Sequence, residues 1–250
     1  MTIHLHRSGR GTPLLMLHGL GMDRHVWDGL AALSDHRELI GCDLPGHGET
    51  PTPAQPYGIE DLSEELGATL RQHGIQRADI IGHDLGGVVA QHLAAHDPGM
   101  VDRLILCGTT PTYNEDDQAL WRQHAAAARR TGAATVALSL EADWFAPAFR
   151  ASAPPALRQM RDSFDACTPE GIADACEALA SADLIEFAGE IYARTLVLVG
   201  DSDTLAYREA ADWLAQSIAG AKLAFVPHAA HMPMLEQPGW MTEVLRAFLG

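Results

Sequence analysis

One turn constrains the fold of this chain more than any other part of its sequence. The stretch Ile80-Ile81-Gly82-His83-Asp84-Leu85-Gly86-Gly87 ends an apolar run typical of a buried strand and opens a segment with a helical pattern. Glycines on both sides of Asp84 let the backbone turn sharply enough to lift the central side chain above a sheet. The sequence therefore predicts a strand, a tight turn that presents Asp84, and a helix.

The rest of the chain continues this alternation of strands and helices. Near-continuous apolar runs predict strands covered on both faces at 14–17, 38–42, 78–82, 104–108, 195–200 and 223–226. Helical patterns lie between them, at 26–33, 59–73, 87–95, 206–218 and 240–248. Such alternation predicts an α/β fold in which helices flank a mostly parallel central sheet.

The segment 112–194 interrupts the alternation, because it contains no convincing strand. Eighty structureless residues are implausible inside a compact domain, so we expect a helical insertion. We therefore expect residues 1–111 and 195–250 to form the core, and 112–194 to form a helical cap over the carboxyl edge of the sheet, where ligands bind in open α/β sheets. Within it, Trp144 and Arg150 are either an aromatic wall and an anchor for a substrate carboxylate or simply cap packing.

Two later strand ends carry the residue types of a hydrolytic site. Gly200-Asp201-Ser202-Asp203 closes one predicted strand and offers two acids, and Pro227-His228-Ala229-Ala230-His231 closes the last one and offers a base. The order Asp84, Asp203, His231 matches the order nucleophile, acid, base that a nucleophile elbow on an α/β sheet requires.

With Leu17-His18-Gly19-Leu20-Gly21 and Asp43-Leu44-Pro45-Gly46-His47-Gly48, these motifs resemble the α/β-hydrolase superfamily over the entire chain. The insertion is most similar to the 3-oxoadipate enol-lactonase branch, through 143–150 and 168–173. The resemblance implies a cap and a small ester or lactone substrate that carries a carboxylate. It also implies a catalytic acid at Asp203 rather than Asp201, a base at His231, and an oxyanion hole made of the backbone N–H groups of Leu20 and Leu85.

Asp84 departs from that branch, which uses Ser. When a carboxylate attacks an ordinary ester carbonyl, the adduct tends to expel the carboxylate again, because its conjugate acid has a pKa of about 4 and an alkoxide is a far poorer leaving group. Three alternatives follow. The favoured one is a hydrolase of an ester or lactone, in which Asp84 replaces Ser, natively or by introduction, and attacks an activated enol lactone or acts as a general base on water.

The second alternative is attack by Asp84 on a saturated carbon, as in haloalkane dehalogenases, fluoroacetate dehalogenases and epoxide hydrolases, followed by hydrolysis of the alkyl-enzyme ester. Supporting residues of those groups are absent: Leu85 stands where dehalogenases carry Trp or Arg, and only Tyr113 and Tyr192 are expected near the cap. The third alternative is a non-catalytic ligand-binding protein on the same fold, against which Asp203 and His231 count.

Charge and composition exclude other classes. Lys and Arg number 17 and Asp and Glu 33, so the net charge of −16 repels phosphate backbones and anionic lipid, and nucleic acid and membrane are not expected partners. Four cysteines without metal-ligand spacing, no signal peptide and no run of 18 apolar residues indicate a cytoplasmic protein. We expect a small-molecule substrate and water, no metal and no organic cofactor, and leave open a homo-oligomer.

Overall fold

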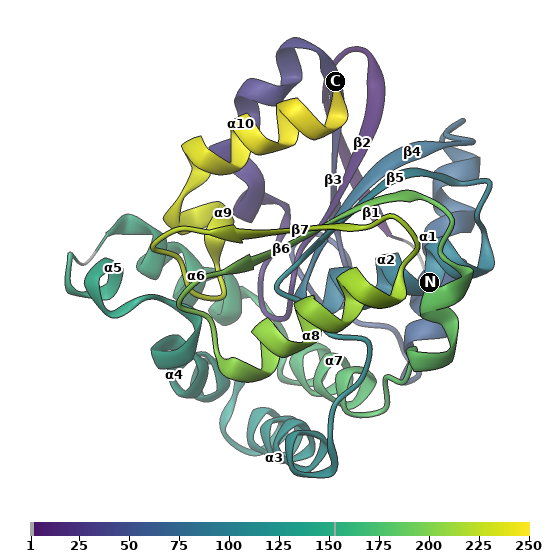
Figure 1. Ribbon diagram of the computed structural model, residues 1–250. Helices are drawn as coiled ribbons and strands as arrows, with labels where there is room; N and C mark the ends of the chain where they lie inside the picture. Colours follow the sequence, from purple (N-terminus) through teal and green to yellow (C-terminus); the bar gives the residue numbers. More distant parts are fainter. Residues whose placement is uncertain (1–2, 153) are drawn as a thin grey trace.

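The computed structural model describes residues 3–152 and 154–250. A seven-stranded sheet lies at its centre, in the order β1-β3-β2-β4-β5-β6-β7 (Figure 1). The pair β1–β3 is antiparallel and every other neighbouring pair is parallel. The strands are β1 His4–Gly9, β2 Thr12–Leu17, β3 Arg37–Asp43, β4 Ala78–His83, β5 Val101–Cys107, β6 Arg194–Gly200 and β7 Lys222–Val226.

The structure confirms the predicted fold class and all six predicted strands, and it adds β1. This strand is at the edge of the sheet and most of its residues are exposed. An exposed edge strand needs no continuous apolar run, which is why the hydrophobic pattern did not reveal it. The central β4, by contrast, is buried along its whole length.

Helices cover both faces of the sheet. The 3₁₀ segment η1 Arg24–Asp35 packs with α10 Pro238–Leu249 over one face, and α1 Ile59–Gln72, α2 Asp84–His96 and α8 Leu205–Ser217 cover the other (Figure 1). The short α9 Pro233–Glu236 precedes α10. No helix among the described residues is long and apolar enough to cross a membrane.

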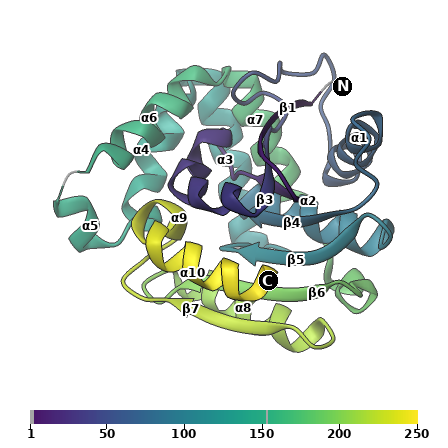
Figure 2. The ribbon, with the colours of Figure 1, turned by 90° about the horizontal axis from the view of Figure 1, so that it is seen from above.

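The segment between β5 and β6 is helical, as expected. It contains α3 Glu115–Thr131, α4 Ala133–Trp144, α5 Pro147–Ala151, α6 Pro155–Ala166, α7 Pro169–Ala180 and the 3₁₀ turn η2 Ile185–Glu190. Figures 1 and 2 show α3 to α7 gathered at one end of the sheet. The most extensive contact inside this group is between α3 and α7.

The turn between β4 and α2 is tight because two glycines lie against backbone. Asp84 has φ +47°, a left-handed conformation that few residues with a side chain adopt, and α2 begins at this residue rather than at Gly87. A Cβ on Gly86 would lie 2.5 Å from the His18 carbonyl oxygen, and one on Gly82 would collide with the Gly86 backbone. The glycines are therefore needed for the close approach of the elbow to the loop after β2.

Gly86→Ala is expected to lower the free energy of unfolding by about 2 kcal/mol, because rigid backbone surrounds the added methyl group. Urea unfolding followed by circular dichroism measures the change. Gly189→Ala is the matched control, since nothing lies within 4 Å of a Cβ at that position. Equal effects of the two substitutions would contradict the packing described for the elbow.

Candidate active site

The Asp84 carboxylate is fully buried and only one of its oxygens is hydrogen-bonded. The Leu20 N–H donates to Oδ2 at 2.9 Å, whereas Oδ1 has no hydrogen-bond partner among the described residues. Burial raises the pKa of Asp84 above its ordinary value, although His231, the N–H groups of Leu20 and Leu85 and the Tyr207 hydroxyl favour the ionised form. The amides expected to form an oxyanion hole thus stabilise the carboxylate of Asp84 itself.

His231 lies beside the elbow with one ring nitrogen bonded and the other free. Its Nδ1 lies 3.1 Å from Oδ2 of Asp203, and its buried Nε2 has no partner in the described part of the chain. Burial lowers the pKa of His231, but the carboxylates of Asp203, Asp84 and Glu236 together outweigh it and the net shift is upward. A proton on Nδ1 that bonds to Asp203 leaves Nε2 as the basic nitrogen.

Asp201, the other acid of the loop that carries Asp203, does not contact His231. Asp201 accepts hydrogen bonds from the His228 N–H at 3.0 Å and from the Ser202 hydroxyl at 2.9 Å. His228 has φ +58°, so Asp201 supports a strained turn. The structure therefore brings Asp203, and not Asp201, to His231.

Two neighbouring histidines hold backbone in place. His83 Nε2 donates to the carbonyl oxygen of His231 at 2.8 Å. His18 donates through Nδ1 to the Gly19 carbonyl and accepts at Nε2 from the Leu44 N–H. Burial lowers the pKa of both rings, so both are neutral at pH 7.

A cavity of about 400 Å³ reaches the His231 side of this site, whereas Asp84, Leu20 and Leu85 are fully buried and do not line it. His231 and Asp203 line it together with Trp144 of α4, whose ring centroid lies 5.6 Å from that of His231. Trp144 is therefore at the site, as the aromatic-wall interpretation expects. No group of three or more His, Cys, Asp or Glu side chains within 3–152 and 154–250 is arranged to hold a metal ion.

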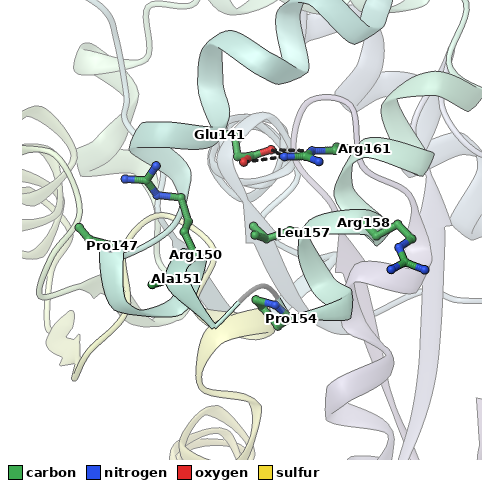
Figure 3. Close-up of a pocket in the computed structure, with 8 residues that line it drawn as sticks. All are labelled: Glu141, Pro147, Arg150, Ala151, Pro154, Leu157, Arg158 and Arg161. Carbon is green, nitrogen blue, oxygen red and sulfur yellow. Dashed lines mark hydrogen bonds and ion pairs between the residues drawn. The ribbon is translucent and has the colours of Figure 1, made fainter.

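Arg150 does not line that cavity. It borders a separate hollow between α4, α5 and α6, where Glu141 and Arg161 form an ion pair at 2.7 Å (Figure 3). The prediction that Arg150 anchors a substrate carboxylate at the catalytic site thus has no support in the geometry. Sequence spacing indicated only that Arg150 belongs to the cap, and the chain turns it away at α5.

Of the two tyrosines expected near the cap, Tyr113 lies close to a second tyrosine, but that tyrosine is Tyr207 and not Tyr192. Tyr192 is 72% exposed and its hydroxyl donates a hydrogen bond to Glu190, so it is not part of the buried site. Tyr207 of α8 instead packs on His231, with ring centroids 4.2 Å apart, and its hydroxyl lies 3.4 Å from that of Tyr113. Burial raises the pKa of both phenols well above the ordinary value, so both keep their proton at neutral pH.

Glu236 is a further buried group that the sequence did not single out. Its Oε1 accepts from the Ala146 N–H at 2.8 Å and its Oε2 from the Ala230 N–H at 2.7 Å. Glu236 therefore ties the start of α5 to the residue that precedes His231. Burial raises its pKa from 4.5 to about 7.

Glu236 predicts a specific dependence of stability on pH. Because its pKa is higher in the folded state, the folded protein binds more protons between pH 4.5 and 7, and stability falls as pH rises through this window. Glu236→Gln removes this contribution, which is at most about 3 kcal/mol. Urea unfolding at pH 5 and pH 8 should show a smaller pH difference for Glu236→Gln than for the parent. The exposed Glu243→Gln should keep the parent's difference, and an unchanged Glu236→Gln would contradict the assignment.

Comparison with known proteins agrees with this architecture. Residues 12–238 match the family model described as alpha/beta hydrolase fold. A 3-oxoadipate enol-lactonase of Acinetobacter baylyi is 28% identical over 237 residues, covering 94% of this chain and 88% of the relative. A pimeloyl-[acyl-carrier protein] methyl ester esterase of Chromobacterium violaceum is 32% identical over 246 residues, covering 94% and 93%.

Among solved structures, the enol-lactonase from Burkholderia xenovorans LB400 superposes with a TM-score of 0.94 at 30% identity, covering 99% of this chain and 96% of that one. The predicted resemblance is thereby confirmed for the superfamily and for its enol-lactonase-like members. The chain belongs to the α/β-hydrolase fold family and is a hydrolase.

Proposed function

We propose that this protein hydrolyses a small carboxylic ester or a lactone, with Asp84 as nucleophile, His231 as base and Asp203 as the acid that orients it. One observation carries the proposal: Oδ1 of Asp84 and Nε2 of His231 are both buried and without hydrogen-bond partners, while the opposite atom of each is bonded. The esterase and lactonase names of the relatives support the same bond type.

The hydrogen bond to Oδ2 of Asp84 determines in which step the N–H groups of Leu20 and Leu85 can act as an oxyanion hole. Since Oδ2 already accepts from the Leu20 N–H and the Leu85 N–H also favours the Asp84 carboxylate, these amides are not free for a substrate oxyanion in the first step. They are in place when water attacks Cγ of Asp84 in the second step, because the negative charge then develops on Oδ2. The first step is therefore restricted to esters and lactones with a weakly basic leaving oxygen, such as an enol or a phenol.

The reaction then has two covalent steps. Oδ1 attacks the acyl carbon, the bond to the leaving oxygen breaks, and protonated His231 supplies its proton, which leaves a mixed anhydride on Asp84. Neutral His231 next takes a proton from water, whose oxygen attacks Cγ of Asp84. The substrate acid leaves with the former Oδ1, and Asp84 is regenerated with a solvent oxygen.

We also propose that residues 112–194 act as a cap on a core of 1–111 and 195–250. The contact of Trp144 with His231 supports this, because it brings α4 directly against the base. The small substrate enters between this cap and α8, where Tyr207 also lines the cavity.

Attack on a saturated carbon is a second candidate, favoured by the same Leu20–Asp84 hydrogen bond. An SN2 displacement by Oδ1 needs no oxyanion hole, and the amides again serve only the hydrolysis of the resulting alkyl ester. The protonated hydroxyls of Tyr113 and Tyr207 can donate to an alkoxide leaving group, as an opening epoxide requires.

A substrate panel separates the two candidates. Aryl acetates and enol lactones should be hydrolysed with a higher kcat/KM than epoxides and haloalkanes of similar size. Turnover of epoxides or haloalkanes alone would replace the first candidate by the second, and turnover of none of them would contradict both.

A further inference from the structure

The cavity at the proposed site carries an unusual balance of charge. Its lining includes the carboxylates of Asp117, Asp143 and Glu209, in addition to Asp203, and none of its described lining residues is Lys or Arg. Asp203 is paired with His231, and Asp117 accepts from the Asn114 amide. Asp143 and Glu209 are exposed and have no hydrogen-bond or ion-pair partner among the described residues. The cavity therefore carries negative charge that no Lys or Arg among its described lining residues neutralises.

Aromatic rings form much of the remaining wall. Trp121, Trp144, Tyr113 and Tyr207 all line the cavity. The faces of such rings attract cations, most strongly where the cation is shielded from water. The rings also extend to the reactive centre, since both Trp144 and Tyr207 pack against His231.

The same cavity contains an atom that lacks a partner. Nε2 of His231 is buried on the cavity wall and makes no hydrogen bond to a described residue. A bound molecule would thus meet a basic nitrogen, carboxylates and aromatic side chains on the wall of one cavity. The only arginine proposed to recognise a carboxylate, Arg150, borders a different hollow.

We propose that this cavity selects a substrate with a positively charged end, such as a quaternary or protonated amine on the leaving phenol or enol, and rejects substrates that carry a carboxylate. The inference rests on the proposed ester hydrolysis for its catalytic meaning, but not for binding. It differs from the carboxylate-bearing substrate that the family resemblance implies. The reason is electrostatic: a carboxylate entering the cavity meets like charges without a compensating cation.

Binding of three small alcohols tests this selectivity. Choline, its uncharged isostere 3,3-dimethylbutanol, and 4-hydroxybutanoate are titrated into the full-length protein at low ionic strength, with tryptophan fluorescence and calorimetry as readouts. Choline should bind at least about tenfold more tightly than 3,3-dimethylbutanol, and 4-hydroxybutanoate should not bind measurably. Added salt should weaken the binding of choline alone.

Two substitutions and a control locate the effect. Asp143→Asn and Glu209→Gln should each weaken choline binding on the order of threefold to fivefold, and should leave 3,3-dimethylbutanol unchanged. Asp212→Asn is the matched control, because Asp212 is an exposed acid on the same helix as Glu209 but does not line the cavity. Asp212→Asn should leave the binding of both choline and 3,3-dimethylbutanol unchanged.

Three aryl acetates that carry the same kinds of group, 3-(trimethylammonio)phenyl acetate, 3-tert-butylphenyl acetate and 3-acetoxybenzoate, separate this inference from the proposed function, because each has the weakly basic leaving oxygen that the first step needs. If choline binds selectively but none of the esters is hydrolysed, ester hydrolysis is wrong and the charge selectivity stands. If esters are hydrolysed but the neutral or anionic alcohol binds as tightly as choline, or choline does not bind, the charge selectivity is overturned.

Discussion

His231→Asn is expected to reduce kcat on the order of 10³-fold or more, because among the described residues His231 is the base placed to activate water beside Asp84. Its Nε2 is the one free nitrogen of the buried His231–Asp203 pair. In the first covalent step the variant loses only the proton that His231 supplies to the leaving oxygen, and a weakly basic phenolate leaves without it. With an aryl ester the intermediate should therefore form, and it should persist because water is no longer activated. Mass spectrometry of the peptide that contains Asp84 should then detect a mass increase equal to the transferred group.

His228→Asn is the matched control for this experiment. His228 lies three residues earlier, is exposed, and has a left-handed conformation that Asn tolerates. It should retain parental kcat and show no adduct. Full turnover by His231→Asn would contradict the role proposed for His231, provided that both variants keep the parental circular dichroism spectrum.

Asp84→Ser is expected to raise activity toward ordinary alkyl esters such as ethyl butanoate by on the order of 10²-fold. The smaller side chain removes Oδ2 from the Leu20 N–H, so the amides of Leu20 and Leu85 become free for a substrate oxyanion. Ser also forms an acyl ester that water activated by His231 can hydrolyse. The initial rates of parent and variant on the same ester measure the effect.

Asp84→Asn distinguishes a gain through Ser from a mere loss of the carboxylate. Asn has nearly the shape of Asp and accepts φ +47°, but its amide is neither nucleophile nor base. It should be inactive on every substrate. An Asp84→Ser variant that is no better on esters than Asp84→Asn would show that the amides of Leu20 and Leu85 are not placed as an oxyanion hole.

Sequence pattern predicted the core of this fold well, because each central strand is a buried apolar run followed by a turn. It missed β1, whose exposed residues carry no such pattern. It placed α2 three residues late, since helical periodicity does not reveal a helix that begins at a left-handed residue such as Asp84.

The candidate site could be predicted where its residues stand at strand ends, as Asp84, Asp203 and His231 do. Tyr207 and Glu236 were missed because they reach the site from helices, and only the packing of α8 and α9 brings them near His231. The position of Tyr207, four residues after Asp203, was a usable signal. The position of Arg150 was not deducible, because membership of the cap does not determine which cavity a side chain faces.

A single turnover in ¹⁸O-labelled water tests the central claim, that Oδ1 of Asp84 forms a covalent intermediate whose hydrolysis is assisted at Oδ2. Excess enzyme is mixed with an aryl ester or enol lactone, quenched and digested, and the peptide containing Asp84 is weighed by mass spectrometry. Water that attacks Cγ of Asp84 leaves its oxygen in the side chain, so we predict one heavy oxygen in Asp84 and none in the first product. Heavy oxygen in the product alone, with Asp84 unlabelled, would contradict the covalent role and leave Asp84 at most a general base.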